Sequence, residues 1–210
     1  MKTIKLLLIL ACAGLSARSQ QPANTTDYLV HNRSIELLQQ DGKNILKFSE
    51  APGAGLAWLK GVEFSEGTIE FDAKGRDVLQ KSFIGIAFHG LDNENYETIY
   101  FRPFNFQAAD PVRKIHAVQY SFEPKFGFQQ LRDTQKDKYE SGIRPSPAKP
   151  TEWFHVKIEI KGEKISVFVN GASDPCMEIN TLNPKPTGKK IGFWVGNNSN
   201  GDFSNLKISK

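Results

Sequence analysis

The sequence has little cysteine, little histidine and no long apolar run. Its longest apolar segment, Leu6 to Leu15, is shorter than the roughly 20 residues that span a membrane. The four histidines, at positions 31, 89, 116 and 155, are far apart and show no metal-ligand spacing. Phosphate loops, dinucleotide fingerprints and EF-hand loops are also absent. We therefore expect no metal site, no cofactor and no transmembrane span in the mature chain.

The N-terminus has the pattern of a secretory signal. Lys2 and Lys5 precede the apolar run, and Ala17-Arg18-Ser19 is a small-x-small cleavage site before Gln20. We predict a signal peptide over residues 1–19, cleaved near Ser19, and an exported protein that is periplasmic, cell-surface or secreted. Lipid anchoring at Cys12 is disfavoured, because a lipoprotein signal there would cut the apolar run short.

Cleavage changes both the charge and the cysteine count. The signal holds two lysines, one arginine and no acid, so the formal charge falls from +4 by three to +1. No basic block remains to follow a phosphate backbone, so nucleic acid is not an expected partner. Cys176 remains alone, either as a small apolar residue or as a thiol that pairs between molecules.

The rest of the chain has the period-two pattern of β-strands. From Phe154 to Val169, apolar residues alternate with polar ones on either side of Gly162, which predicts a hairpin with one buried face. Similar runs recur at short intervals. The predicted strands are 35–40, 44–49, 55–60, 67–73, 82–89, 96–102, 116–122, 153–161, 164–170, 176–179, 189–196 and 203–209. Twelve short strands and hardly any helix indicate an all-β, two-sheet antiparallel sandwich.

Two segments lack this pattern. Residues 20–33 are polar and without period, so we expect a flexible lead-in before a domain over 34–210. Residues 123–152 hold no clear strand, although Phe126, Phe128, Leu131 and Tyr139 could line one side of a short helix. This excursion is either a functional rim or lid, or a loop packed over one edge of the sandwich.

Several motifs, in order, resemble a known superfamily. Trp153 to Ile158 with Val167 to Gly171, Ile191 to Gly196 with Asp202 to Ile208, and Gly67 to Asp72 are similar to strands of the concanavalin A-like lectin/glucanase superfamily, particularly its laminin-G-like branch. The resemblance covers residues 34–209. It implies a jelly roll with one concave sheet. Members of the superfamily bind or cut glycans, and many only mediate contacts.

The resemblance gives a weak case for catalysis. Family 16 glycoside hydrolases carry Glu-x-Asp-x-Glu on one strand, but the matching stretch from Glu70 ends in Lys74, so one working carboxylate is missing. Glu70 and Asp72 lie about 7 Å apart along the strand, either as a different catalytic pair or as solvated surface charges. Ile84 to His89 and Tyr96 to Arg102 are loosely similar to the 3-keto-disaccharide hydrolases, from which no catalytic residue is transferred.

A binding site is better supported. Gly85, Ala87 and His89 alternate with large apolar residues, as Gly192, Trp194 and Gly196 do, which would leave room for a ligand on one sheet face. Trp194 would stack on a sugar ring, or would fill a gap under a loop. The other candidate ligand-binding residues are Tyr100, Arg102, Gln119 and Asn197. Arg102 could instead form a structural ion pair with Asp92, Asp110 or Glu97.

The sequence therefore predicts an exported carbohydrate-binding, lectin-like domain whose partner is a glycan or glycoconjugate. Two alternatives stay open. One is a glycoside hydrolase with a carboxylate pair other than the family 16 pattern. The other is a non-catalytic module for protein contacts or envelope structure.

Overall fold

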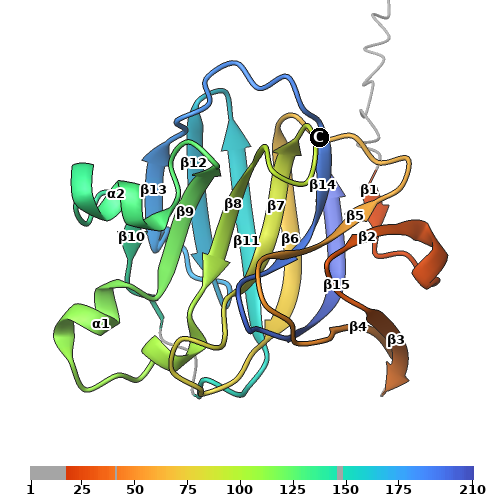
Figure 1. Cartoon of the computed structure of the whole chain (residues 1–210), viewed down its shortest axis with the longest axis horizontal. Coiled ribbons are helices and arrows are strands. Elements are labelled where there is room, and N and C mark those ends of the chain that lie inside the picture. Colours follow the sequence, from red (N-terminus) through yellow and green to blue (C-terminus); the bar gives the residue numbers. More distant parts are fainter. Residues whose placement is uncertain (1–17, 41, 146–148) are drawn as a thin grey trace, which may run out of the picture.

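The computed structural model describes residues 18–40, 42–145 and 149–210, so most of the predicted signal peptide, including Cys12, lies outside it. Two antiparallel sheets pack face to face as a jelly-roll sandwich (Figure 1). All twelve predicted strands are present, with ends that shift by up to two residues. None of the helices in the described part of the chain is long and apolar enough to cross a membrane.

The first sheet has eight strands. In spatial order they are β13 (Met177–Asn180), β12 (Lys164–Val169), β11 (Phe154–Lys161), β6 (Gly67–Lys74), β15 (Gly201–Ser209), β4 (Lys43–Phe48) and β3 (Ile35–Gln40), with β1 (Arg18–Gln20) paired to β15. The predicted hairpin is β11 and β12, in register from Val156 opposite Val169 to Lys161 opposite Lys164. Gly162 takes the positive φ of 57° that the turn requires.

The second sheet has seven strands, and most of the helical residues lie at its edge. In order they are β10 (Glu140–Ser141), β9 (Val118–Glu123), β8 (Tyr96–Phe101), β7 (Ile84–Gly90), β14 (Lys190–Val195), β5 (Gly55–Leu59) and β2 (Tyr28–His31). Helices α1 (Pro111–Ile115) and α2 (Phe128–Thr134) lie on the side of β9 and β10 (Figure 1). The 3₁₀ turns are η1 (Thr25–Asp27) and η2 (Pro103–Asn105).

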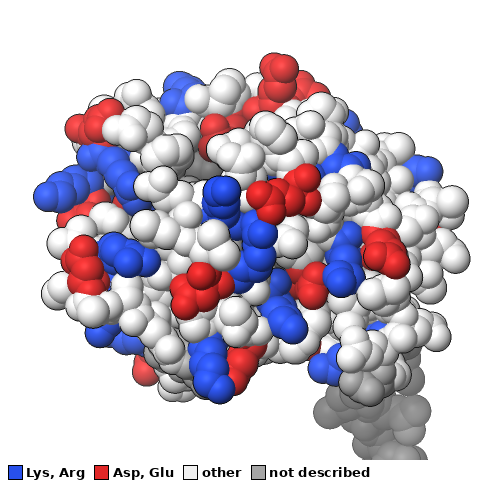
Figure 2. All heavy atoms as spheres, turned by 60° about the horizontal axis from the view of Figure 1, so that its bottom comes forward, with Lys and Arg blue, Asp and Glu red and all other residues white. Residues whose placement is uncertain are grey.

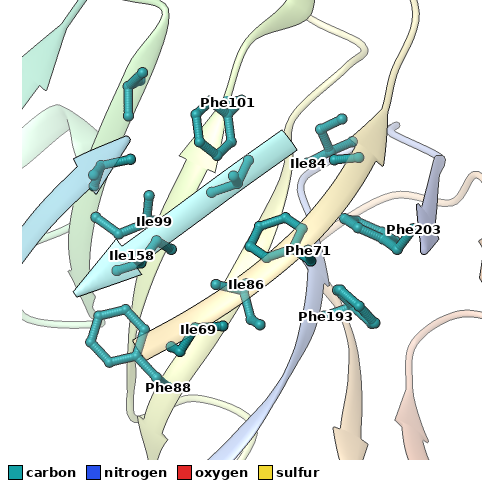
Figure 3. Close-up of a cluster of buried hydrophobic side chains, with 14 of the residues drawn as sticks. Ile69, Phe71, Ile84, Ile86, Phe88, Ile99, Phe101, Ile158, Phe193 and Phe203 are labelled. Carbon is teal, nitrogen blue, oxygen red and sulfur yellow. The ribbon is translucent and has the colours of Figure 1, made fainter. Parts of the chain in front are cut away.

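The core lies between the sheets and follows from the alternation. Figure 3 shows Ile69 and Phe71 of β6 and Ile158 of β11 against Ile84, Ile86, Phe88, Ile99 and Phe101 of the other sheet, all fully buried. Phe193 stacks on Phe203 across the sheets, with ring centroids 4.4 Å apart. Cys176 is buried as a free thiol, and burial raises its pKa to about 11, so it is an apolar core residue here.

The expected flexible lead-in is wrong in its second half. Residues 28–31 form β2, which pairs with β5 from Tyr28 opposite Leu59 to His31 opposite Leu56. Tyr28 is 4% exposed and belongs to the core. This edge strand could not be predicted from alternation, because Leu29 and Val30 are both exposed and the pattern of a half-buried strand is missing.

Candidate functional site

A pocket of about 1100 Å³ opens on the outer face of the seven-stranded sheet. Its floor is formed by Tyr96 and Tyr100 of β8 and Trp194 of β14. Three segments make the walls: residues 79–83, residues 102–116 and residues 123–133, which include α2. Part of the 123–152 excursion is therefore a wall of this pocket.

The strand register explains which side chains meet on the outer face of the sheet, part of which forms the floor. Gln119, Tyr100, Gly85, Trp194 and Leu56 lie side by side on β9, β8, β7, β14 and β5. The adjacent row on the same face is Ser121, Thr98, Ala87, Gly192 and Trp58. Large residues in one row therefore flank mostly small ones in the next.

Neighbouring side chains and backbone occupy the space over the small residues on this sheet face. Tyr96 reaches across this row, because its hydroxyl accepts a hydrogen bond from Trp194 Nε1 at 3.2 Å and its ring packs edge-on against Trp58. A Cβ at Gly85 would overlap the carbonyl of Ile99, and one at Gly192 the carbonyl of Ala57. The sequence-based expectation of open space at Gly85, Ala87 and Gly192 is corrected: these residues are small because neighbouring backbones and rings approach closely.

Trp194 lines the pocket but is largely covered. It is 8% exposed, and the ring of Tyr100 lies 4.9 Å away at an angle of 36°. Gly196 allows Phe83 and the indole to approach, since a Cβ there would lie 2.7 Å from Phe83 Cβ. Trp194 therefore exposes a small part of its side chain to the pocket, and most of it packs within the floor.

Arg102 is held by protein groups on both terminal nitrogens. Nη1 donates to Glu140 at 2.8 Å and to the carbonyl of His116, while Nη2 donates to Gln119 Oε1 at 2.9 Å and to the Tyr100 hydroxyl. The sequence named other acidic partners for Arg102. It missed Glu140 because that residue lies on a two-residue strand next to β9.

Glu140 joins two arginines. Arg132 of α2 donates from Nε and Nη2 to the Glu140 carboxylate at 3.0 and 2.7 Å. Burial works to raise the pKa of Glu140, but Arg132 and Arg102 outweigh it and hold the pKa below its usual range. Glu140 is thus an ionised carboxylate that binds both Arg102 and Arg132. Gln119, a predicted ligand-binding residue, is fully buried and does not line the pocket, because its side chain bonds to Arg102 and to the carbonyls of Tyr120 and Tyr139.

His116, Asp137 and Glu140 are close enough to one another to hold a metal ion. Their chemistry does not fit one well, because both oxygens of Glu140 already accept hydrogen bonds from guanidinium groups. A cation placed there would be repelled by Arg102 and Arg132.

Both floor phenols are hydrogen-bond donors toward the pocket. Burial raises the pKa of Tyr96 to about 12 and also raises the pKa of Tyr100, so both remain protonated at neutral pH. Each oxygen already accepts a bond from the protein, from Trp194 and Arg102 respectively. Neither O–H donates a hydrogen bond to a described residue, so each can donate to a ligand.

Glu123, at the end of β9, is a pocket carboxylate that the sequence analysis did not single out. It lies opposite Tyr96 and faces the pocket, and it forms no ion pair with any described residue. Burial raises its pKa. Its position could have been inferred, because it continues the alternation of Gln119 and Ser121, but the pocket around it required the fold.

His89 does not lie in the pocket. Its φ is 49°, which breaks the alternation of β7 and turns the side chain inward. There Nδ1 is 2.6 Å from the buried carboxylate of Glu97, and Nε2 is 2.6 Å from the carbonyl of Ser65. The expected placement of His89 on the open face is therefore corrected, while Asn197 does line the pocket and accepts a hydrogen bond from Gly53 N.

Glu70 and Asp72 lie on the outer face of the other sheet, across the sandwich from the pocket. The alternating burial of β6 puts Ile69, Phe71 and Ala73 in the core and these two carboxylates outside. Asp72 contacts His155 Nδ1 at 2.8 Å, and Glu70 lies 3.6 Å from His155 Nε2. Burial works to raise the pKa of Asp72, but hydrogen bonds from His155 and Asn205 lower it.

No protein-family model matches the chain, and no curated protein matches its sequence. Among solved structures, carbohydrate-binding module CBM66 from Bacillus subtilis has a TM-score of 0.59 at 14% identity, covering 87% of this chain and 96% of that chain. The exoplasmic/lumenal domain of VIP36, in a Ca²⁺- and Man3GlcNAc-bound form, has a TM-score of 0.58 at 9% identity over 90% and 85%. A native glycosidic hydrolase has a TM-score of 0.55 at 13% identity over 92% and 96%. The chain thus has the concanavalin A-like sandwich fold of lectins and glycoside hydrolases, and likeness at this identity concerns the fold alone.

Proposed function

We propose that this protein binds an oligosaccharide in the pocket over the seven-stranded sheet. The observation that carries the proposal is the pairing of an aromatic floor with planar polar groups at its ends, Arg113 and Asn105 on one side and Glu123 on the other. Aromatic rings suit the apolar C–H faces of a sugar, and fixed amides, guanidinium groups and carboxylates suit its hydroxyls. A volume of about 1100 Å³ accommodates more than one sugar residue.

The charge distribution also supports a glycan partner. Figure 2 shows Lys and Arg side chains interspersed with Asp and Glu on the face it presents, without an extended basic surface there. Export through the signal at residues 1–19 is part of the proposal, since it would bring the domain to extracytoplasmic glycans.

A second candidate function is hydrolysis of the bound glycan. Glu123 favours it, because a partly buried carboxylate with a raised pKa and no ion pair to the residues that the structure describes has the properties of a general acid. Asp133 of α2 also lines the pocket and could act as its partner carboxylate. Binding without cleavage remains the leading proposal because neither carboxylate is positioned by a cation or by a second carboxylate.

The test is to incubate the purified protein with a broad panel of oligosaccharides and to measure retention and new reducing ends together. We expect retention of at least one class without product. Glu159→Gln, on the outer face of the opposite sheet, is the matched control and should bind as the parent does. Retention of no oligosaccharide would contradict the proposal, and release of reducing ends would establish the hydrolase instead.

Glu123→Gln is expected to stabilise the unliganded protein at pH 7 and to weaken glycan retention. Burial raises the pKa of Glu123 in the folded state above its unfolded value, so the folded protein binds this proton more tightly and ionisation costs stability as pH rises. The gain in thermal midpoint should therefore be present at pH 7 and vanish below about pH 4, where Glu123 is protonated in both states. Thermal unfolding of both proteins from pH 3 to pH 8 measures it.

Glu36→Gln, an exposed change on β3, controls for the loss of one negative charge. A lower midpoint for Glu123→Gln at pH 7 would show that the carboxylate makes a stabilising structural contact and would remove Glu123 from the proposed site.

A further inference from the structure

One end of the pocket is rich in cationic side chains. Arg102, Arg113, Arg132 and His116 all line it there, and we refer to these four residues as the basic end. Glu140 neutralises part of this charge by contacting Arg102 and Arg132, and Asp137 lies 3.3 Å from His116 Nε2. The three arginines outnumber their acidic partners, because among the described residues Glu140 is the one carboxylate that forms an ion pair with any of them.

The protein acceptors at the basic end are already used. Both oxygens of Glu140 accept from arginines, and Gln119 Oε1 accepts from Arg102. Asn105 Oδ1 accepts from Arg113, and the carbonyl of His116 accepts from both Arg102 and Asn105. Spare hydrogen-bonding capacity at this end is therefore mostly donor capacity, which a ligand with strong acceptors would satisfy.

Arg113 is the best-placed donor. Its Nε donates to Asn105 Oδ1 at 3.0 Å and its Nη2 donates to the carbonyl of Phe104 at 2.7 Å. These two bonds fix the plane of the guanidinium group, and Nη1 donates no hydrogen bond to a described residue. A guanidinium group held in this way loses little side-chain entropy when it binds an oxyanion.

The two ends of the pocket differ in charge, because the end away from the basic end carries the carboxylate of Glu123. This difference would orient a bound ligand. Glu123 lies opposite Tyr96 on β8, whereas the basic end begins at Arg102, beyond Tyr100 on the same strand. A ligand lying along β8 would place an acceptor group at Arg113 and hydroxyl donors at Glu123. The two phenolic O–H groups of the floor would donate to oxygens between these ends.

We propose that the basic end binds an oxyanion carried by the glycan, so that the ligand class is an acidic oligosaccharide. The inference rests on the proposed function and refines it. A uronic acid carboxylate and a sulfate ester share the required chemistry, because both present paired oxygens to a guanidinium group. Arg113 is the specificity-determining residue of this subsite.

The experiment compares binding of acidic and neutral oligosaccharide probes to the purified protein by titration calorimetry at two salt concentrations. The probes are an oligogalacturonide, the same oligomer after reduction of its carboxyl groups to neutral alcohols, and a sulfated galactose oligomer. We expect at least one acidic probe to bind about tenfold or more tightly than the neutral one, and its affinity to fall with added salt. The two acidic probes distinguish carboxylate from sulfate.

Variants at Arg113 test the assignment. Arg113→Gln should abolish the preference for the acidic probe, and Arg113→Lys should retain part of it, since it keeps the charge but loses the planar fork. Lys114→Gln removes the same charge from an exposed neighbour on α1 and should have little effect. Thermal midpoints of all three variants show whether Arg113→Gln still folds. If Arg113→Gln does not fold, binding by Arg113→Lys provides the test.

Two results would overturn the inference. Equal affinity for neutral and acidic probes, unchanged in Arg113→Gln, would leave glycan binding in place and remove the oxyanion subsite. Binding of none of the probes, nor of any member of the wider panel, would remove the proposed function together with the inference.

Discussion

Glu97→Ala is expected to lower the free energy of unfolding by about 3–5 kcal/mol, because several buried donors would lose the acceptor that they share. Glu97 is fully buried between the sheets. Its carboxylate lies 2.6 Å from both His89 Nδ1 and the Tyr120 hydroxyl. Thr181 and Asn183 also donate to it. Alanine would leave these donors without an acceptor in a dry environment, which costs more than the loss of the contacts themselves.

The network also connects distant parts of the chain. Asn183 and Thr181 follow β13, Tyr120 is on β9, and His89 Nε2 donates to the carbonyl of Ser65. That carbonyl can only accept, so Nε2 is the donor in this contact, and Nδ1 is the ring nitrogen that contacts Glu97. Loss of Glu97 should therefore loosen the contact between the segment after β13 and the seven-stranded sheet.

Denaturant unfolding measures the effect, with Glu94→Ala as control, because Glu94 lies in the same hairpin but is exposed. Glu97→Gln should fall between the parent and Glu97→Ala, since an amide can still accept from Tyr120 and Thr181. A loss below about 1 kcal/mol in Glu97→Ala would show that the donors find other partners and would contradict this account.

Trp194→Ala is expected to lose glycan retention and also about 3–5 kcal/mol of stability, the usual cost of deleting a buried tryptophan. A stacking ring open to solvent would be removable with little change in thermal midpoint. Trp194 is instead packed against Tyr100 and hydrogen-bonded to Tyr96, with only 8% of its surface exposed. Its loss would leave a cavity in the floor and free both tyrosine rings to move.

Trp194→Phe should restore most of the stability but not the hydrogen bond to Tyr96. Leu79→Ala, a change at an exposed rim residue of the same pocket, is the control for altered pocket lining without core damage. A parent-like thermal midpoint in Trp194→Ala would contradict the packing role and would return the indole to the role of an exposed platform. Thermal unfolding and oligosaccharide retention on the same samples separate the two effects.

The sequence by itself determined the twelve half-buried or central strands, the hairpin at Gly162 and the sandwich architecture. It could do so because these features depend on local alternation, which assigns each residue of a strand to one of two faces. Strands β1, β2 and β10 escaped prediction, since β1 and β10 have three and two residues and β2 leaves consecutive apolar residues exposed. The alternation in the sequence also predicted that Tyr100, Arg102 and Trp194 lie on the same face of one sheet.

The tertiary structure decided what that face contains. Whether Gly85 and Gly192 leave room for a ligand depends on neighbouring strands and on Tyr96, which lies across them. The pocket is closed by α2 and the 102–116 segment, and both meet at Glu140 of β10, which binds Arg132 of α2 and Arg102, 38 residues before it in the chain. Alternation along a strand cannot report such contacts, because it fixes the side to which a residue points and not the distant segment that covers it.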